Sequence, residues 1–163
     1  MSEGGLTHKP LDGVAEYVAA LDEICGLAQQ SLFIFENDFD SLGFDSEVRY
    51  NTLRRFLLSS PFVCLHLLAH DTEPLVRFCP RIMTLLRQFS HVMHIYQTPT
   101  NLRHLTAPFA VADSQHFVRR FHFNDTRGIF GQNDPQESIL LKSRFEEIWA
   151  SSHPNASGSV LGL

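Results

Sequence analysis

The stretch that decides the fold is residues 62–96, FVCLHLLAHDTEPLVRFCPRIMTLLRQFSHVMHIY. Residues 62–69 are apolar except for one histidine and predict a buried strand. Glu73 then opens a helix with apolar residues at three-to-four spacing, and Pro80 inside that run predicts a kink or a late start. Residues 93–96 predict another strand. Strands that alternate with helices in this way indicate an α/β fold with a parallel central sheet.

The same alternation extends toward the N-terminus. Residues 14–29 place apolar side chains at three-to-four spacing and predict an amphipathic helix, whereas residues 32–35 are a bulky apolar run that predicts a buried strand. Residues 46–59 predict a second helix, which Pro61 stops. In that helix Arg49 is expected away from the apolar side, which is made by Val48, Leu53, Phe56 and Leu57.

Toward the C-terminus the pattern changes to a hairpin. Residues 109–112 and 117–121 flank the polar segment 113–116, which predicts two antiparallel strands joined by a turn. Asp134 opens a last helix. The sequence therefore predicts an α/β/α sandwich with a mixed, mainly parallel sheet and an antiparallel edge hairpin.

Length and composition indicate one domain. The 163 residues are 44% hydrophobic and include fourteen Phe, which suffices for a core and excludes a disordered chain. Residues 1–12 and 154–163 are small, polar or glycine-containing, so we expect flexible ends around one domain at 13–153. No apolar run approaches the ~20 residues of a membrane span, and the first residues lack the order of a signal peptide. Three cysteines without a CxxC cannot all pair, which favours the cytoplasm.

Charge is distributed unevenly along the chain. Residues 1–47 carry ten acidic side chains and one basic side chain, whereas residues 48–145 carry twelve basic and six acidic ones. This distribution indicates an anionic ligand, two faces that attract each other in the fold, or ordinary scatter of surface charge. The net charge of −5 argues against nucleic acid as a partner.

The histidines and cysteines form no recognised metal or catalytic motif. The pairs His66/His70 and His91/His94 lack a cysteine or carboxylate at a known metal-ligand spacing, so neither a metal nor another cofactor is predicted. The chain also contains no GxSxG, no GxGxxG and no Gly-rich phosphate loop. Cys64 lies in an apolar stretch, where packing is expected rather than a nucleophile. No catalytic residue is predicted from these motifs.

Polar side chains around the predicted hairpin make the first candidate site. Arginine and histidine suit phosphate or carboxylate recognition, because their N–H groups are directional donors. Strand alternation places Arg119 and Arg120 on opposite faces, so one of them is expected at a cleft or a helix interface. The alternative is an edge hairpin kept soluble by its charges. The candidate ligand-binding residues are His104, Asp113, His116, Arg119, Arg120, His122 and Arg127.

A second candidate site follows the first two predicted strands. The carboxyl ends of parallel strands share one edge of the sheet, where ligands collect in open α/β folds. Asp38 and Asp40 could act there as acid and base, together with His70 and Asp71. Acidic residues in such loops are also common as turn residues and helix caps, and this structural alternative stays open.

Four stretches carry a family resemblance: LFIFENDFDSLGFD (32–45), HLLAHDTEPLVRFCPRIMTLLRQFSHVMHIY (66–96), FAVADSQHFVRR (109–120) and NDPQESILLKSRFEEIWASS (133–152). Through them the chain resembles a phospholipase-D-like half-domain. More closely, it resembles a bacterial family of uncharacterised domains on that fold, whose members are sometimes attached to acetyltransferase domains. The resemblance spans residues 14–152.

The resemblance implies a catalytic motif that this chain lacks. Active members of the superfamily carry His-x-Lys-x4-Asp, in which the His attacks phosphorus and the Lys binds the phosphate oxygens. With Asp113 at the motif's Asp, Thr106 stands at the His position and Pro108 at the Lys position. Arg120-Phe121 replaces the Gly-Ser that follows, and no His-x-Lys occurs anywhere in the chain. We therefore expect no phosphohistidine mechanism.

These observations favour a catalytically degenerate phospholipase-D-like domain that binds an anionic ligand or a protein partner. Because members of the superfamily pair two halves, the resemblance also implies a homodimer. Two alternatives stay open: a hydrolase or phosphodiesterase with a relocated site, and a nucleic-acid-binding module.

Overall fold

The structure, a computed structural model, describes residues 5–40 and 42–156. Its single sheet has eight strands in the order β1-β7-β6-β5-β2-β3-β4-β8. The strands are β1 (Thr7–Asp12), β2 (Ser31–Glu36), β3 (Cys64–Ala69), β4 (Met93–Gln97), β5 (Phe109–Ala112), β6 (His116–Arg120), β7 (Arg127–Gln132) and β8 (His153–Ala156). The helices are α1 (Val14–Leu27), α2 (Glu47–Leu58), α3 (Glu73–Phe78), α4 (Pro80–Gln88) and α5 (Pro135–Ser151), with a 3₁₀ turn, η2 (Thr100–Leu102).

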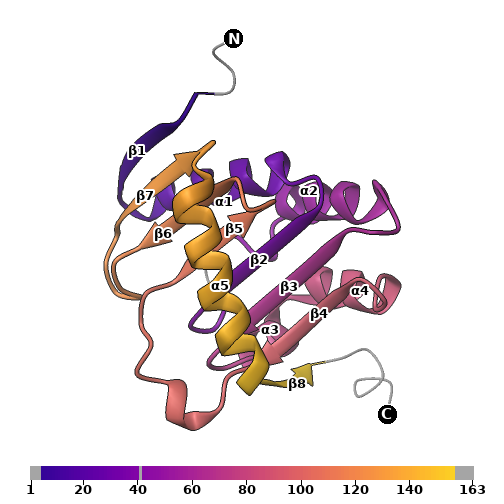
Figure 1. Ribbon diagram of the computed structural model, residues 1–163. Coiled ribbons are helices and arrows are strands. Elements are labelled where there is room, and N and C mark those ends of the chain that lie inside the picture. Colours follow the sequence, from indigo (N-terminus) through magenta and orange to yellow (C-terminus); the bar gives the residue numbers. More distant parts are fainter. Residues whose placement is uncertain (1–4, 41, 157–163) are drawn as a thin grey trace.

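The sheet lies between two unequal helical layers (Figure 1). Helices α1 to α4 cover one face, and α5 crosses the other. Strand β2 explains this arrangement, because Leu32 and Ile34 belong to the core beneath the larger layer. Phe33 and Phe35 belong to the core beneath α5, together with Phe145. Successive side chains of a strand point to opposite faces, so a strand that is apolar throughout needs cover on both.

The mixed α/β sandwich is confirmed, but two details of the predicted sheet are wrong. Within residues 5–40 and 42–156, the parallel pairings are β2–β3 and β3–β4, and the others are antiparallel. The predicted hairpin, β5 and β6, does not form an edge, because β5 pairs with β2 and β6 pairs with β7. The hairpin instead occupies the middle of the sheet, since β7 and β1 extend the sheet beyond it.

The edge strands come largely from segments predicted to be flexible. Residues 7–12 form β1 on β7, and β8 pairs with β4 at the opposite edge. Pro10 fits an edge strand, because proline has no backbone N–H to donate and an edge strand needs to bond a neighbour on one side only. The rest of the predicted flexible ends, residues 1–4 and 157–163, lie outside the described residues.

Two glycines let β7 lie close to β6. A Cβ added at Gly128 would collide with the carbonyl oxygen of Arg119, and a Cβ at Gly131 would collide with the ring of Phe117. Interiors are packed closely enough that neither position can accept a side chain without a shift of backbone or core. Glycine at both positions is therefore a packing requirement of the sheet.

Helix boundaries follow the predicted signals. Ser46 caps α2 by accepting a hydrogen bond from the backbone N–H of Arg49 at 3.0 Å, and Asp134 caps α5. The predicted break at Pro80 is confirmed, since it separates α3 from α4. In the part of the chain that the structure describes, no helix combines the length and apolarity needed to cross a membrane.

The prediction for Arg49 is wrong. Its side chain is fully buried, whereas Val48, expected on the apolar side of α2, is 64% exposed. Arg49 Nε donates to Asp22 Oδ1 of α1 at 2.6 Å, and the guanidinium lies 4.7 Å from the centre of the Phe44 ring. The buried contact between α1 and α2 therefore contains an ion pair, where the apolar pattern of α2 predicts an aliphatic side chain such as Val48.

Candidate functional site

A buried ion pair lies where β2 and β6 end. Glu36 is the last residue of β2 and Arg120 the last of β6, and their Oε1 and Nη2 atoms are 3.0 Å apart. The hydroxyl of Tyr17, on α1, donates to Glu36 Oε2 at 3.1 Å, and the Arg120 guanidinium lies over the Tyr17 ring. Arg120 also donates to the carbonyl oxygen of Phe123 at 3.0 Å. All three side chains of this group are buried.

Burial dominates the electrostatics of the Tyr17–Glu36–Arg120 group. It raises the pKa of Glu36 to about 7, although Arg120 and the Tyr17 hydroxyl act in the opposite direction. Burial and the neighbouring Glu36 carboxylate also raise the pKa of Tyr17 well above its ordinary value. Arg120 therefore stabilises a charge inside the fold instead of presenting its guanidinium to a ligand.

His70, from the second predicted site, is held inside the fold by both ring nitrogens. Its Nε2 lies 2.6 Å from the carbonyl oxygen of Leu105, and its Nδ1 lies 2.5 Å from the hydroxyl oxygen of Thr98. A carbonyl oxygen only accepts, so Nε2 carries the proton and Nδ1 accepts from the hydroxyl. Burial lowers the pKa of His70, although its bond to Leu105 acts against the shift. His70 is thus a neutral histidine with both nitrogens engaged.

The acidic residues of the second predicted site make local turn contacts. Asp38 Oδ1 accepts from the backbone N–H of Asp40 at 3.0 Å, and Asp71 Oδ1 accepts from the backbone N–H of Glu73 at the same distance. Such contacts are typical of turn and cap residues. The structure therefore favours the structural alternative for the carboxylates of Asp38 and Asp71, whereas Asp40 takes part through its backbone N–H.

The residues of the first predicted site are divided among three places. Asp113 and His116 lie at the turn between β5 and β6, whereas Arg119 and Arg120 lie at the far end of β6. Arg119 and Arg120 do face opposite sides of the sheet, because Arg119 pairs with Glu137 of α5 and Arg120 with Glu36. His104 and His122 lie in loops, and Arg127 is the first residue of β7.

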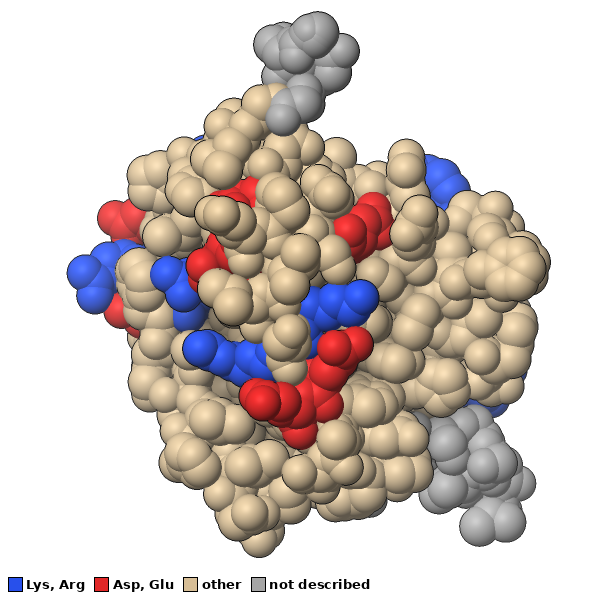
Figure 2. All heavy atoms as spheres, in the orientation of Figure 1, with Lys and Arg blue, Asp and Glu red and all other residues tan. Residues whose placement is uncertain are grey.

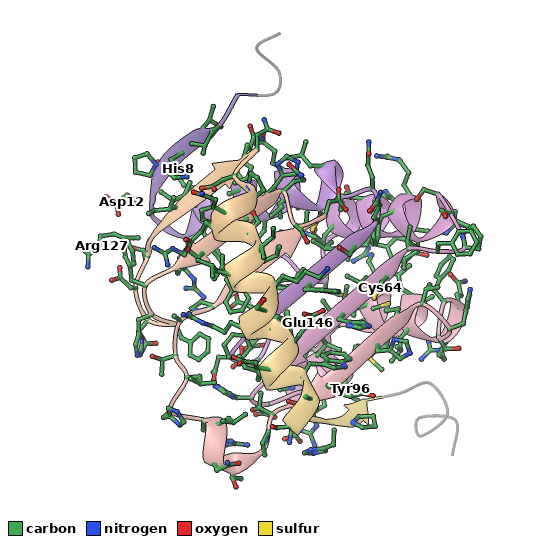
Figure 3. All side chains as sticks on the ribbon, viewed as in Figure 1. His8, Asp12, Cys64, Tyr96, Arg127 and Glu146 are labelled. Atoms are coloured by element: carbon green, nitrogen blue, oxygen red, sulfur yellow. The ribbon has the colours of Figure 1, made fainter. Side chains whose placement is uncertain are left out.

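These three residues make local contacts of their own. His104 is exposed, with its Nδ1 3.1 Å from the carbonyl oxygen of Asn101. His122 Nδ1 accepts from the backbone N–H of Asn124 at 3.0 Å. Arg127 binds both carboxylate oxygens of Asp125, at 3.1 and 2.9 Å, and lowers the pKa of Asp125 to about 2. Figure 3 shows Arg127 beside Asp12 at the β1–β7 edge.

Arg119 lines a small basic cavity between α5 and the ends of β5 and β6. Its volume is about 160 Å³. Arg119 Nη1 lies 3.5 Å from Glu137 Oε2, whereas Arg144 of α5 has no ion pair with a described residue. Figure 2 shows the charged side chains of this face gathered over α5 and along the β7 side. The cavity is lined by Ala107, Pro108, Phe109, Arg119, Arg120, Phe121, Leu141 and Arg144.

A larger and differently lined cavity lies at the opposite end of these strands. Its volume is about 530 Å³, and Asp113 and His116 form part of its wall. The Asp113 carboxylate accepts hydrogen bonds from the backbone N–H groups of residues 29, 30 and 31, at 2.7 to 3.2 Å. Asp113 thus ties the β5–β6 turn to the start of β2. The other lining residues are Leu27, Gln29, Gln30, Gln115, Gln132 and Asn133.

The sheet face beside α5 carries few charges. In Figure 2 the area over β3 and β4 is almost free of Lys, Arg, Asp and Glu, and Figure 3 places Cys64 and Tyr96 on these strands. His66 stacks on Trp149 at 4.1 Å between ring centres and lies 3.0 Å from Cys64 Sγ. Burial, with His94 nearby, lowers the pKa of His66 to about 4. Among the described residues, no three His, Cys, Asp or Glu side chains are placed to share a metal ion.

The sequence analysis missed Glu36, Tyr17 and Arg144. Glu36 follows an apolar run directly, and the pattern assigns it to the polar loop although it is the last residue of β2. The sequence does place a glutamate at the end of one predicted strand and an arginine at the end of another. That pattern could have indicated an ion pair. Nothing in the local pattern marks Arg144, because its role depends on how α5 crosses the sheet.

The family comparison classifies the chain. Residues 14–158 match the family described as "Domain of unknown function (DUF7931)". The chain belongs to this DUF7931 family. No curated protein matches it in sequence.

Solved structures show which fold the DUF7931 domain has. It is similar to the phospholipase D family member Nuc from Salmonella typhimurium (11% identity, TM-score 0.63), over 93% of this chain and 99% of Nuc. It is also similar to NucT from Helicobacter pylori (10% identity, TM-score 0.61), over 91% and 99%. TrmBL2, an archaeal chromatin protein, matches at 12% identity and TM-score 0.68, over 90% of this chain but only 54% of TrmBL2. The phospholipase-D-like fold expected from the sequence is confirmed.

Two positions that the sequence resemblance aligns with the phospholipase D motif lie close together in the structure. Pro108, at the position of the motif's Lys, and Arg120, at the position of the following Gly, both line the basic cavity. Among the described residues that line this cavity there is no lysine, and its arginines are Arg119, Arg120 and Arg144.

Proposed function

We propose that this DUF7931 domain binds an anionic ligand and does not hydrolyse phosphodiesters. The observation that carries the proposal is the basic cavity lined by Pro108, Arg119 and Arg144. Guanidinium groups bind phosphate and carboxylate oxygens through paired donors and stay charged at every physiological pH. A cavity of about 160 Å³ suits one small anionic group. Glu137, 3.5 Å from Arg119, is the carboxylate that such a group would displace.

The absence of reacting groups supports binding over catalysis. Thr106 stands where the superfamily has its nucleophilic histidine, and a hydroxyl without an adjacent base is a weak nucleophile. Arg120 is engaged with Glu36, and His70 has hydrogen-bond partners on both nitrogens. A relocated hydrolytic site at Asp38, Asp40, His70 and Asp71 is disfavoured, because the Asp38 and Asp71 carboxylates make turn contacts and both ring nitrogens of His70 are engaged in the core.

Three further properties belong to the same proposal. Nucleic acid is disfavoured by the net charge of −5, although TrmBL2 is described as binding DNA. A protein partner or a second copy of the chain would bind the face over β3 and β4, where Figure 2 shows almost no charged side chains. A cytoplasmic location agrees with three free thiols, at Cys25, Cys64 and Cys79.

Inorganic phosphate is expected to bind at the basic cavity, and Arg144→Gln is expected to weaken that binding about tenfold. A titration followed by ¹H–¹⁵N NMR checks this, because the backbone signals of residues 107–109 and 119–121 should shift and saturate. Arg54→Gln is the matched control, since Arg54 is an exposed arginine of α2, on the other face of the sheet. Equal affinities for the two variants, or tighter and steeply salt-dependent binding of a short DNA duplex, would contradict the proposal.

No hydrolysis of bis(p-nitrophenyl) phosphate above the buffer rate is expected, because the nucleophile and the phosphate-binding lysine are absent. Absorbance of released nitrophenolate measures it, for the natural chain and for Asp113→Ala. Circular dichroism on both proteins establishes that they are folded. Turnover by the natural chain that disappears in a folded Asp113→Ala protein is the result that overturns the non-catalytic proposal.

A further inference from the structure

The cavity of about 530 Å³ lies far from the basic cavity, at the other end of β5 and β6. At this end α1 terminates, β2 begins, and β5 and β7 end (upper edge of the sheet in Figure 1). The volume is within the range of small-molecule sites. Neither the family description nor the proposed anion site accounts for this cavity.

Side-chain amides dominate the cavity lining. A side-chain amide carries two N–H donors and a carbonyl acceptor, so the wall contains both kinds of partner. Gln132 and Asn133 already use a donor within the fold, on Glu23 and on the carbonyl oxygen of Gly5. The amide residues are Gln29, Gln30, Gln115, Gln132 and Asn133. The single aliphatic residue is Leu27, and the one ring among the described lining residues is the imidazole of His116. The described wall contains no Phe, Tyr or Trp, the larger rings on which bases and other flat apolar ligands usually stack.

The two titratable groups of the cavity are held in fixed orientations. Asp113 is oriented by backbone N–H groups, among them that of Gln30 at 2.7 Å. His116 Nδ1 accepts from the backbone N–H of Asn133 at 3.1 Å, so the proton of the neutral ring is on Nε2. Burial lowers the pKa of His116 despite the nearby Asp113 carboxylate. The wall therefore holds one oriented acceptor group and one oriented donor.

The charges around the cavity disfavour an anion. No lysine or arginine is among its described lining residues. The C-terminal end of α1 points toward it and contributes partial negative charge, and Gln132 Nε2 donates to the Glu23 carboxylate at 3.0 Å. An anionic ligand would face the Asp113 carboxylate without a compensating Lys or Arg among the described lining residues.

We propose that this cavity binds a neutral polyhydroxylated ligand of the carbohydrate class. Hydroxyl groups are donors and acceptors at once, so neighbouring hydroxyls match amides that alternate between the two roles. An Asp carboxylate and a neutral imidazole N–H add one fixed acceptor and one fixed donor. A ligand with large apolar surface would leave these polar groups without partners, which is unfavourable in a closed contact.

A titration with D-glucose, N-acetyl-D-glucosamine and D-ribose, followed by ¹H–¹⁵N NMR, tests the proposal. At least one of these sugars is expected to give saturable shifts confined to residues 27–31, 113–116 and 132–133. Gln30→Ala and Gln115→Ala should each weaken that binding about tenfold, the effect of losing one or two hydrogen bonds. Both side chains are exposed, so the variants are expected to fold. Gln136→Ala, an exposed glutamine of α5 outside the cavity, should leave the affinity unchanged.

Three results overturn the proposal. The first is the absence of saturable shifts with all three sugars at tens of millimolar. The second is binding that Gln30→Ala and Gln115→Ala leave intact, because the sugar would then lie elsewhere. The third is tighter binding of glucose 6-phosphate than of glucose at these same residues, which would make the cavity an anion site. Phosphate binding at Arg144 is measured separately, so either proposal can fail without the other.

Discussion

Replacing Arg120 by methionine is expected to lower the free energy of unfolding by about 3–5 kcal/mol at mildly alkaline pH, because it leaves a buried carboxylate without its counter-charge. Glu36 is 2% exposed, and Arg120 is its partner at 3.0 Å. Methionine preserves much of the length and volume of the arginine side chain, so a cavity contributes little to this loss. Urea unfolding followed by the fluorescence of Trp149 measures the effect.

The effect of Arg120→Met should depend on pH in a defined direction. The fold raises the pKa of Glu36 from its ordinary value near 4.5 to about 7. Between these two pH values the carboxyl group of the folded protein keeps a proton that the unfolded chain loses. Stability of the natural protein therefore falls as pH rises through this window. Without Arg120 the pKa rises further and the fall continues above 7. The loss caused by the substitution should thus be smaller at about pH 5 than at about pH 8.

The double variant Glu36→Gln, Arg120→Met is the control for the charge. It removes both members of the pair, so it should recover a large part of the lost stability at alkaline pH. A loss from Arg120→Met that is equal at both pH values, and that the double variant does not recover, would show that packing alone determines the effect.

Gly128→Ala is expected to destabilise the fold by about 2–4 kcal/mol, because the new methyl group has no space between β7 and β6. The atom it meets is the carbonyl oxygen of Arg119, which belongs to the backbone of a central strand and cannot rotate away. Thermal and urea unfolding measure the change. Loss of folded protein during expression would be the extreme form of the same result.

Gly26→Ala is the matched control for this substitution. Gly26 lies in α1, and a Cβ there would have no heavy atom within 4 Å. Alanine is the better helix former by up to about 1 kcal/mol, so this variant should be neutral or stabilising. If the two variants changed stability equally, the close approach of β7 to β6 would not be the limiting contact.

The elements predicted from the sequence are those whose own residues determine them. Strand β2 is built on a continuous apolar run and β3 on one that only His66 interrupts, and α1 and α5 repeat apolar residues at helical spacing, so the local pattern suffices. Strand β1 buries one residue, Leu11, and is otherwise exposed. Nothing in such a segment distinguishes it from a loop until its partner β7 is known. Strand β7 was not predicted either, because its two glycines interrupt the apolar pattern.

The sequence predicted which way side chains of the candidate sites face, but not which residues meet there. Alternation along β6 correctly places Arg119 and Arg120 on opposite faces. The partner of Arg120 is Glu36, 84 residues away in the chain. Their meeting depends on the order β2-β5-β6 within the sheet, which no local pattern contains. For the same reason Asp113 and Gln30 share a cavity wall although the sequence presents them as unrelated.

The strand order has a consequence for anything joined to this domain. Strand β1 forms one edge of the sheet and β8 the other, so the first and last strands are separated by the whole width of the sheet. Adjacent strands are about 4.8 Å apart, and the sheet therefore holds these two strands at roughly 34 Å from each other. If fluorescent proteins were fused before β1 and after β8, the sheet between the two strands would keep them apart. Their energy transfer would report directly on whether both edge strands remain attached.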